Sequence, residues 1–162
     1  MDRDSMDEIK SIIETVTVNI TPETAFSAFV EELNEWWPQG YTWSQDVLEE
    51  IGIEPKQGGF CYEIGPSGFR CDWGKIVEYE PPQLLKFTWQ IGPNREPVPN
   101  PDKASKVIVS FERGAKDVTH VKLEHTQFHN HGEGAEGYHD AMASEYGWPY
   151  ILKRFRDHAD EK

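Results

Sequence analysis

The segment from Gly58 to Ile91 constrains the fold of this chain more than any other part of the sequence. It contains three runs in which apolar and polar residues alternate, and two turns rich in glycine and proline separate these runs. Side chains that alternate in this way point to opposite faces of a β-strand. Because the aromatic residues recur at the same spacing, the segment predicts a twisted antiparallel sheet with one strongly aromatic face.

The rest of the sequence predicts further strands and a small number of helices. Ile9–Ile20 is rich in β-branched residues and predicts the first strand. Thr21 is a good N-cap and Pro22 suits the first helical position, so a short helix is expected to run to about Leu33, followed by a second short element that ends at Pro38. Further strands are expected at Val47–Ile53, in the run after Gly59, and at Phe69–Tyr79, Leu84–Ile91, Lys106–Arg113 and Val118–Phe128.

A long helix is expected at the end of the chain, over Gly137–Ala159. Pro149 removes one helical hydrogen bond, so this helix is expected to bend or break near Glu145. The order of elements predicts an α+β fold in which a curved sheet of about seven antiparallel strands packs on the C-terminal helix. With 162 residues, of which 37% are hydrophobic and 12% aromatic, the chain is expected to form a single domain over residues 1–162, with a flexible tail at residues 1–8.

The charge of the chain argues against several classes of partner. Acidic residues outnumber basic ones 29 to 16, which gives a net charge of -13. Such a chain repels phosphate groups and anionic lipid surfaces, so neither nucleic acid nor a membrane is an expected partner. The first eight residues lack the apolar core of a signal peptide, and no segment reaches the roughly 18 apolar residues of a membrane span. A cytoplasmic location is therefore expected, with Cys61 and Cys71 as free thiols.

Several motifs resemble those of proteins related to the activator of heat-shock protein 90 ATPase. These proteins belong to the helix-grip superfamily of START, birch-pollen-allergen-like and polyketide-cyclase domains. The residues that carry the resemblance are Gly58-Gly59-Phe60, Asp72-Trp73-Gly74-Lys75-Ile76-Val77, Pro81-Pro82-Gln83-Leu84-Leu85, Trp89, Gly147-Trp148-Pro149 and Leu152.

This resemblance implies a helix-grip fold with an internal cavity between the sheet and the C-terminal helix. The leading functional hypothesis is a protein that binds a small apolar or aromatic ligand in this cavity. A second hypothesis is an enzyme that resembles cyclases and dehydratases, and a third is a module that binds a chaperone, so the sequence leaves open whether the protein is an enzyme.

Two residues are candidates for acid/base catalysis. If the terminal helix is continuous, Glu145 falls on its apolar side, where a carboxylate needs a buried partner or faces a cavity. The alternative for Glu145 is a structural bond to the sheet. His125 is in phase with Val121 and Leu123 and is expected to point into the core, as a catalyst or as a hydrogen-bonded core histidine. The candidate ligand-binding residues are Trp37, Trp43, Tyr62, Trp73, Phe87, Trp89, Tyr138, Met142, Glu145 and Trp148.

Other polar clusters give weaker signals. His129, His131 and His139 could together bind a transition metal, but the sequence contains no paired metal-binding motif, and no metal and no cofactor is expected. Glu63 and Asp72 occur on neighbouring predicted strands and could form a carboxylate pair. No motif for a catalytic nucleophile, a P-loop or a dinucleotide site is present.

Overall fold

The structure is a computed structural model that describes residues 9–94 and 96–162. The tail expected at residues 1–8 lies outside the described residues. Seven strands form one antiparallel sheet in the order β1-β7-β6-β5-β4-β3-β2, which confirms the predicted helix-grip fold. The strands are β1 (Ile12–Val18), β2 (Glu50–Ile53), β3 (Phe60–Ile64), β4 (Arg70–Glu80), β5 (Leu84–Trp89), β6 (Ser105–Arg113) and β7 (Thr119–Thr126).

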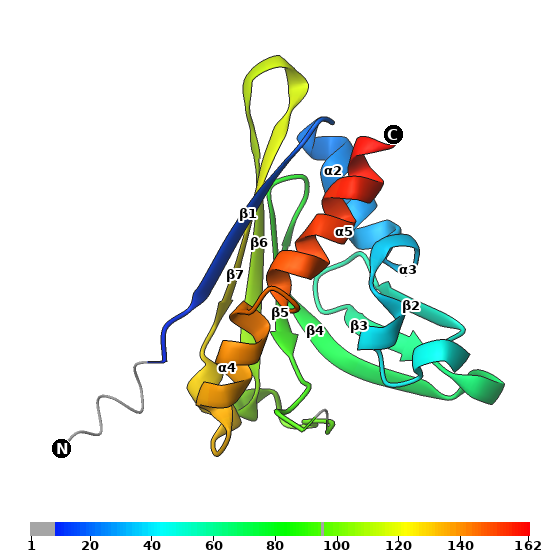
Figure 1. Ribbon diagram of the computed structural model, residues 1–162. Coiled ribbons are helices and arrows are strands. Elements are labelled where there is room, and N and C mark those ends of the chain that lie inside the picture. The colour runs from blue at the N-terminus through cyan, green and yellow to red at the C-terminus, as the bar shows by residue number, and fades with distance from the viewer. Residues whose placement is uncertain (1–8, 95) are drawn as a thin grey trace.

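The sheet curls because β4 is shared between two parts of it. The first half of β4 pairs with β3 and the second half with β5, and the register shifts both at Cys61/Tyr62 and at Ile76/Glu78. Such irregularities bend a strand and increase its twist. In Figure 1, β4 sweeps away from the upright strands and carries β3 and β2 with it. The concave face that results is the face on which the helices pack.

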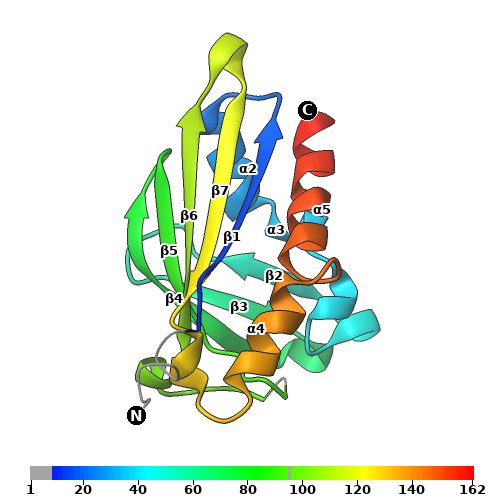
Figure 2. The same ribbon diagram turned by 60° about the vertical axis from the view of Figure 1, so that its left-hand side comes forward.

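The helices cover this concave face. They are α2 (Pro22–Glu31), α3 (Leu33–Trp36), α4 (Ala135–Ala143) and α5 (Trp148–Asp160). Figures 1 and 2 show α2, α3 and α5 on the same side of the sheet, with α4 continuing from α5 toward the other end. The predicted cap of α2 is present, since the Thr24 amide donates to the Thr21 hydroxyl at 3.3 Å. Within the described residues, no helix has the length and apolar character needed to cross a membrane.

Aromatic rings fill the space under α2 and α5. Trp36, Phe29 and Phe155 contact one another with ring centroids 4.9 to 5.2 Å apart, and all three side chains are buried. The Trp36 indole donates to the carbonyl of Ala28 at 3.2 Å, so this large side chain is packed without an unsatisfied donor. These rings are therefore core, and the cavity described below lies in the half of the concave face that faces α4.

The terminal helix is interrupted at the expected place. Ser144 adopts an extended backbone with ψ 171°, which ends α4, and Gly147 and Trp148 begin α5. Pro149 lies in the first turn of α5, where its missing N–H costs no helical hydrogen bond. The four residues from Ser144 to Gly147 thus form a linker between the helices, and they lie beside the open part of the concave face.

Candidate functional site

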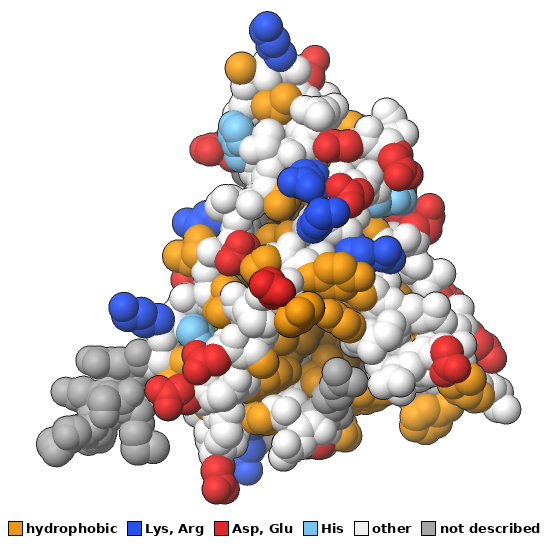
Figure 3. Space-filling model, viewed as in Figure 1, with side chains coloured by type: hydrophobic (Ala, Val, Ile, Leu, Met, Phe, Trp, Pro, Cys, Tyr) orange, Lys and Arg blue, Asp and Glu red, His pale blue; other side chains and the backbone are white. Residues whose placement is uncertain are grey.

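A cavity of about 450 Å³ lies between the sheet and the linker that joins α4 and α5. The space-filling view shows it as a hollow in which hydrophobic side chains gather (Figure 3). The cavity opens to the surface on this side. The residues that line it are Trp37, Tyr41, Thr42, Trp43, Ile51, Glu63, Trp73, Trp89, Ile91, Pro93, Tyr138, Ala141, Met142, Ser144, Tyr146, Gly147 and Ile151.

Tryptophan side chains make up much of the wall. Trp37, Trp73 and Trp89 contact one another with ring centroids 5.6 to 6.2 Å apart, and each is less than a tenth exposed. Trp89 is fixed by a hydrogen bond from its indole to the hydroxyl of Tyr138, which in turn donates to the carbonyl of Ile91 at 2.9 Å. The planes of Trp37 and Trp73 differ by 28° and those of Trp73 and Trp89 by 70°, so the packed rings form an angled, largely apolar surface.

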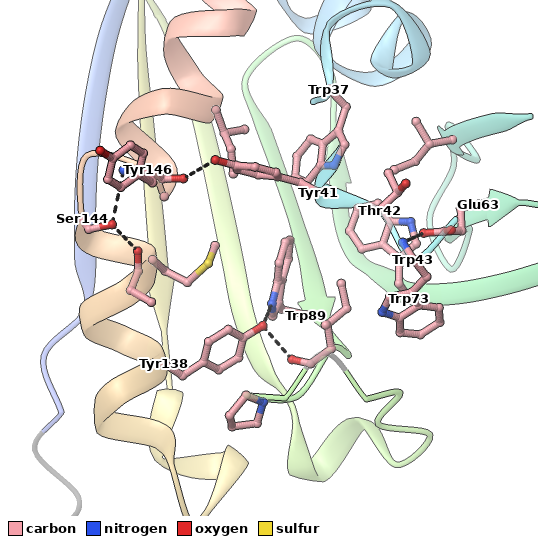
Figure 4. A pocket seen from close by; sticks show the side chains of 17 residues that line it. Trp37, Tyr41, Thr42, Trp43, Glu63, Trp73, Trp89, Tyr138, Ser144 and Tyr146 are labelled. Carbon is pink, nitrogen blue, oxygen red and sulfur yellow. Dashed lines mark hydrogen bonds between the residues drawn. The ribbon is translucent and has the colours of Figure 1, made fainter. Parts of the chain in front are cut away.

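Three of the indole donors in this wall have no acceptor among the described residues. The Nε1 atoms of Trp37, Trp43 and Trp73 are buried and make no hydrogen bond to the described residues. An unsatisfied buried donor typically costs about 1 to 3 kcal/mol. Figure 4 shows these three side chains on the side of the cavity opposite Tyr138 and Tyr146. Unsatisfied donors are therefore concentrated in one wall of the cavity.

Glu63 places a carboxylate in the same wall. Its side chain points inward from β3 and is 4% exposed. Oε1 accepts from the Trp43 amide at 3.1 Å and Oε2 from the Ser44 amide at 2.9 Å (Figure 4). Hydrogen bonds from the backbone to an ionised carboxylate are strong, so Glu63 holds the Trp43–Ser44 turn against the sheet. Among the described lining residues, Glu63 carries the only carboxylate.

Two tyrosines link opposite sides of the cavity mouth. Tyr41 follows α3, and its hydroxyl donates to the backbone carbonyl of Tyr146 in the α4–α5 linker at 2.8 Å. The Tyr41 ring also packs on Tyr150 of α5, with centroids 5.6 Å apart. Both contacts are at the surface, where Tyr146 is 70% exposed. A loop that follows α3 and the broken helix thus meet across the entrance.

The structure brings part of the predicted ligand-binding set together. Trp37, Trp43, Trp73, Trp89, Tyr138 and Met142 all line the cavity. Phe87 and Trp148 are instead packed in the core, and neither lines the cavity.

Tyr62 lies on the outer face of the sheet, where its hydroxyl donates to Glu50 at 2.8 Å and Arg70 stacks on its ring. Burial, with a smaller effect of the Glu50 hydrogen bond, raises the pKa of Tyr62 to about 12.

The expectation that Glu145 faces the interior is wrong. Glu145 is exposed and does not line the cavity. The expectation assumed one continuous helix, whereas the extended backbone at Ser144 ends α4 one residue before Glu145. The helical phase that would have turned this carboxylate inward is therefore lost.

His125 is buried as expected, but it does not reach the cavity. Its ring is fully buried behind Trp89 and Trp148, and burial lowers its pKa well below the usual value. The Ser105 hydroxyl lies 2.7 Å from both the His125 and the His131 Nε2 atoms. Glu145 and His125 are thus separated and do not form an acid/base pair at the cavity.

The structure also separates the members of the other two predicted polar clusters, the Glu63/Asp72 pair and the three histidines. Asp72 is exposed and bonds to Arg70 at 2.8 Å, whereas Glu63 points inward, so these two carboxylates do not form a pair. His131 is joined to Ser105, while His139 lies beside Asp140 at 3.0 Å and His129 is exposed. The structure therefore does not assemble these three histidines into one ligand set.

One other cluster in the described part of the chain has the spacing of metal ligands. Glu32, Glu35 and His158 offer atoms within 4.8 Å of one another. Glu32 already bonds to His158 at 2.7 Å and to the Lys162 ammonium at 2.8 Å. These contacts explain the cluster as an ion-pair network that joins α2 to the end of α5.

The sequence reasoning missed several residues of the site. Thr42 and Tyr41 come from a loop without periodicity, and Tyr146 comes from the helix break, so no pattern marked them. Glu63 was named only as a possible partner of Asp72, although it alternates in phase with buried Cys61 on β3. A carboxylate at an inward position of a strand is a candidate site residue in its own right.

Comparison with known proteins agrees with this fold, which is that of a helix-grip protein. Residues 19–160 match the family described as Activator of Hsp90 ATPase homolog 1-like protein, and the chain belongs to that family. No curated protein sequence matches significantly.

Several solved structures are similar to this chain. One is the anthrahydroquino-γ-pyrone synthase Txn09 complexed with SUM, which is 32% identical over 91% of this chain and 95% of that chain, with a TM-score of 0.65. Another is the self-sacrificing resistance protein CalC from Micromonospora echinospora, 28% identical over 96% of each chain, with a TM-score of 0.64. Protein MLL2253 from Mesorhizobium loti shares the fold at 17% identity, covering 94% of this chain and 98% of that chain, with a TM-score of 0.66.

Proposed function

We propose that this protein binds a small, largely apolar and aromatic molecule in the cavity between β3, β4, β5 and the α4–α5 linker. The observation that carries the proposal is the cavity itself, with its wall of rigid tryptophans. Its volume of about 450 Å³ lies in the range of roughly 300 to 1,000 Å³ that is usual for small-molecule sites. The proposed ligand-binding residues are Trp37, Trp43, Trp73, Trp89, Tyr138 and Met142, together with Glu63 and Tyr41.

The names of two relatives support a ligand of this kind. The synthase Txn09 is named for a fused aromatic product, and CalC is named as a resistance protein. A fused aromatic body would pack against the indole rings of Trp37, Trp73 and Trp89, all of which line the cavity.

The proposal is tested by titration with a neutral apolar fluorophore such as N-phenyl-naphthylamine. Trp37→Ala and Trp89→Ala should each weaken binding at least about tenfold, since each removes a large ring from the wall. Phe69→Ala is the matched control, because Phe69 is 72% exposed and lies outside the cavity. Circular dichroism establishes that each variant is folded. Unchanged binding in both folded tryptophan variants would refute the proposal.

A cyclase-like enzyme is the second candidate, and Glu63 is the observation that favours it. General acid/base catalysis needs a titratable group within reach of the substrate, and Glu63 is the carboxylate in the cavity wall. Turnover of an aromatic polyketide that is lost in Glu63→Gln with retained substrate binding would support the enzyme. Binding of the same compound without turnover would support the first proposal, a protein that binds the molecule without converting it.

Chaperone binding and a cytoplasmic location stay predictions from the sequence. A chaperone-binding module would use an exposed apolar surface rather than a cavity. Pull-down of a chaperone by a variant with a blocked cavity would favour this third possibility.

A further inference from the structure

Glu63 is an unusual component of an otherwise apolar cavity wall. Its carboxylate is 4% exposed and accepts one hydrogen bond at each oxygen, both from backbone amides. Each carboxylate oxygen can accept two hydrogen bonds, so half of its capacity is unused by these contacts. The ion pairs of the described residues lie elsewhere, and no described lysine, arginine or histidine pairs with Glu63.

A buried carboxylate is normally accompanied by a positive charge. Taking such a group out of water costs several kcal/mol unless a cation or several hydrogen bonds compensate. The surroundings of Glu63 favour a cation in a second way, because the faces of tryptophan rings attract positive charge. Figure 4 shows Trp43 and Trp73 beside Glu63 on the same side of the cavity.

We infer that the ligand carries a protonated amine, held against Glu63 and the rings of Trp43 and Trp73, on an aromatic or apolar body that fills the rest of the cavity. This inference rests on the proposed function and specifies the class of ligand. The cavity combines an aromatic wall with one buried carboxylate, which is the combination that recognises an organic ammonium group.

The charge of the whole protein acts in the same direction. A net charge of -13 raises the local concentration of cations and lowers that of anions near the cavity. An aromatic carboxylate of the same size would meet both this field and Glu63, with no described cation in the wall to offset them. Of three ligands with the same aromatic body, we therefore expect the amine to bind most tightly, the alcohol less tightly and the carboxylate most weakly.

The competing explanation is that Glu63 only holds the Trp43–Ser44 turn in place. In that case its charge would matter for stability and not for the choice of ligand. Three probes with the same aromatic body distinguish the two explanations: naphthylmethylammonium, naphthylmethanol and naphthoate. Their dissociation constants are measured by isothermal titration calorimetry at neutral pH on the full chain.

The expected result has two parts. The wild-type protein binds naphthylmethylammonium about tenfold more tightly than naphthylmethanol, and naphthoate most weakly. Glu63→Gln removes this preference, so that the ratio of the dissociation constants for naphthylmethanol and naphthylmethylammonium falls from about ten to about one within the same variant. Glu49→Gln is the control, because Glu49 is exposed and the substitution changes the net charge by the same amount.

The outcomes separate this inference from the proposed function. If the probes bind with no preference for the ammonium group, the inference is wrong and the binding function stands. If Glu63→Gln weakens all three probes equally and lowers stability, Glu63 has a structural role only and the inference is also wrong. If no probe binds the folded wild-type protein, the proposed function itself fails.

Discussion

The indole Nε1 of Trp148 donates a hydrogen bond to Nδ1 of His125 at 2.9 Å, and both side chains are buried. Because Nδ1 accepts this bond, neutral His125 carries its proton on Nε2, where it donates to the Ser105 hydroxyl at 2.7 Å. The hydroxyl can then donate to His131. His125 thus fixes the start of α5 to β7 and β6, and its role is structural.

This arrangement predicts that stability falls in mild acid. Burial lowers the pKa of folded His125 below its value of about 6.5 in the unfolded chain, so the unfolded state binds more protons below that pH. The stabilisation is fully present above about pH 6.5 and is lost as the pH falls toward the folded pKa, with a slope of at most about 1.4 kcal/mol per pH unit for one site. Burial lowers the pKa of His131 in the same direction.

Urea unfolding between about pH 7.5 and pH 5 measures this effect. His125→Gln should be less stable than the wild type at neutral pH and should show a shallower loss on acidification. His129→Gln is the control, since His129 is exposed. An imidazole NMR resonance showing that His125 is protonated in the folded protein at pH 6.5 would contradict the conclusion that the buried ring is neutral.

The helix break predicts opposite effects for two glycine substitutions. A Cβ on Gly147 would collide with the backbone of Met142, at the point where the chain turns from α4 into α5. Gly147→Ala should therefore lower the free energy of unfolding by about 1 to 3 kcal/mol. Gly137 lies within α4 and has no atom within 4 Å of the added carbon, so Gly137→Ala should raise it by about 0.5 to 1 kcal/mol. Equal effects of the two substitutions would show that the linker is not tightly packed.

The tyrosine contact at the mouth predicts an effect on ligand release. Tyr41→Phe removes the hydroxyl that donates to the carbonyl of Tyr146 and keeps the ring. A hydrogen bond of this kind contributes about 0.5 to 1.5 kcal/mol, so the dissociation rate of a bound probe should rise about 2- to 10-fold. Stopped-flow fluorescence measures this rate. Tyr150→Phe keeps the Tyr41–Tyr146 bond and should release the probe at the wild-type rate.

Much of the fold could be predicted from the sequence because burial alternates regularly along the strands. β6 and β7 alternate between buried and more exposed residues over most of their length, and the same phase correctly placed His125 inside. The predicted order of seven strands and short helices is confirmed. Local patterns of this kind are physical consequences of a sheet with one covered face.

The site was harder to predict because it depends on contacts between distant segments. Tyr62 was assigned to the cavity by its aromatic character, but it stands between the buried residues Cys61 and Glu63 on β3 and therefore lies on the outer face. Glu145 was assigned by a helical phase that the break at Ser144 interrupts. Tyr41 and Tyr146 meet because a loop and a helix break face each other across the cavity. The sequence of neither segment alone predicts this contact.

Filling the cavity tests the central claim most directly. Ala141 and Ala143 are both exposed on α4, but only Ala141 lines the cavity. Isothermal titration calorimetry with a neutral aromatic probe should show at least about tenfold weaker binding for Ala141→Trp, because the added indole occupies ligand space, and wild-type affinity for Ala143→Trp. If folded Ala141→Trp binds the probe as tightly as the wild type does, the cavity is not the binding site.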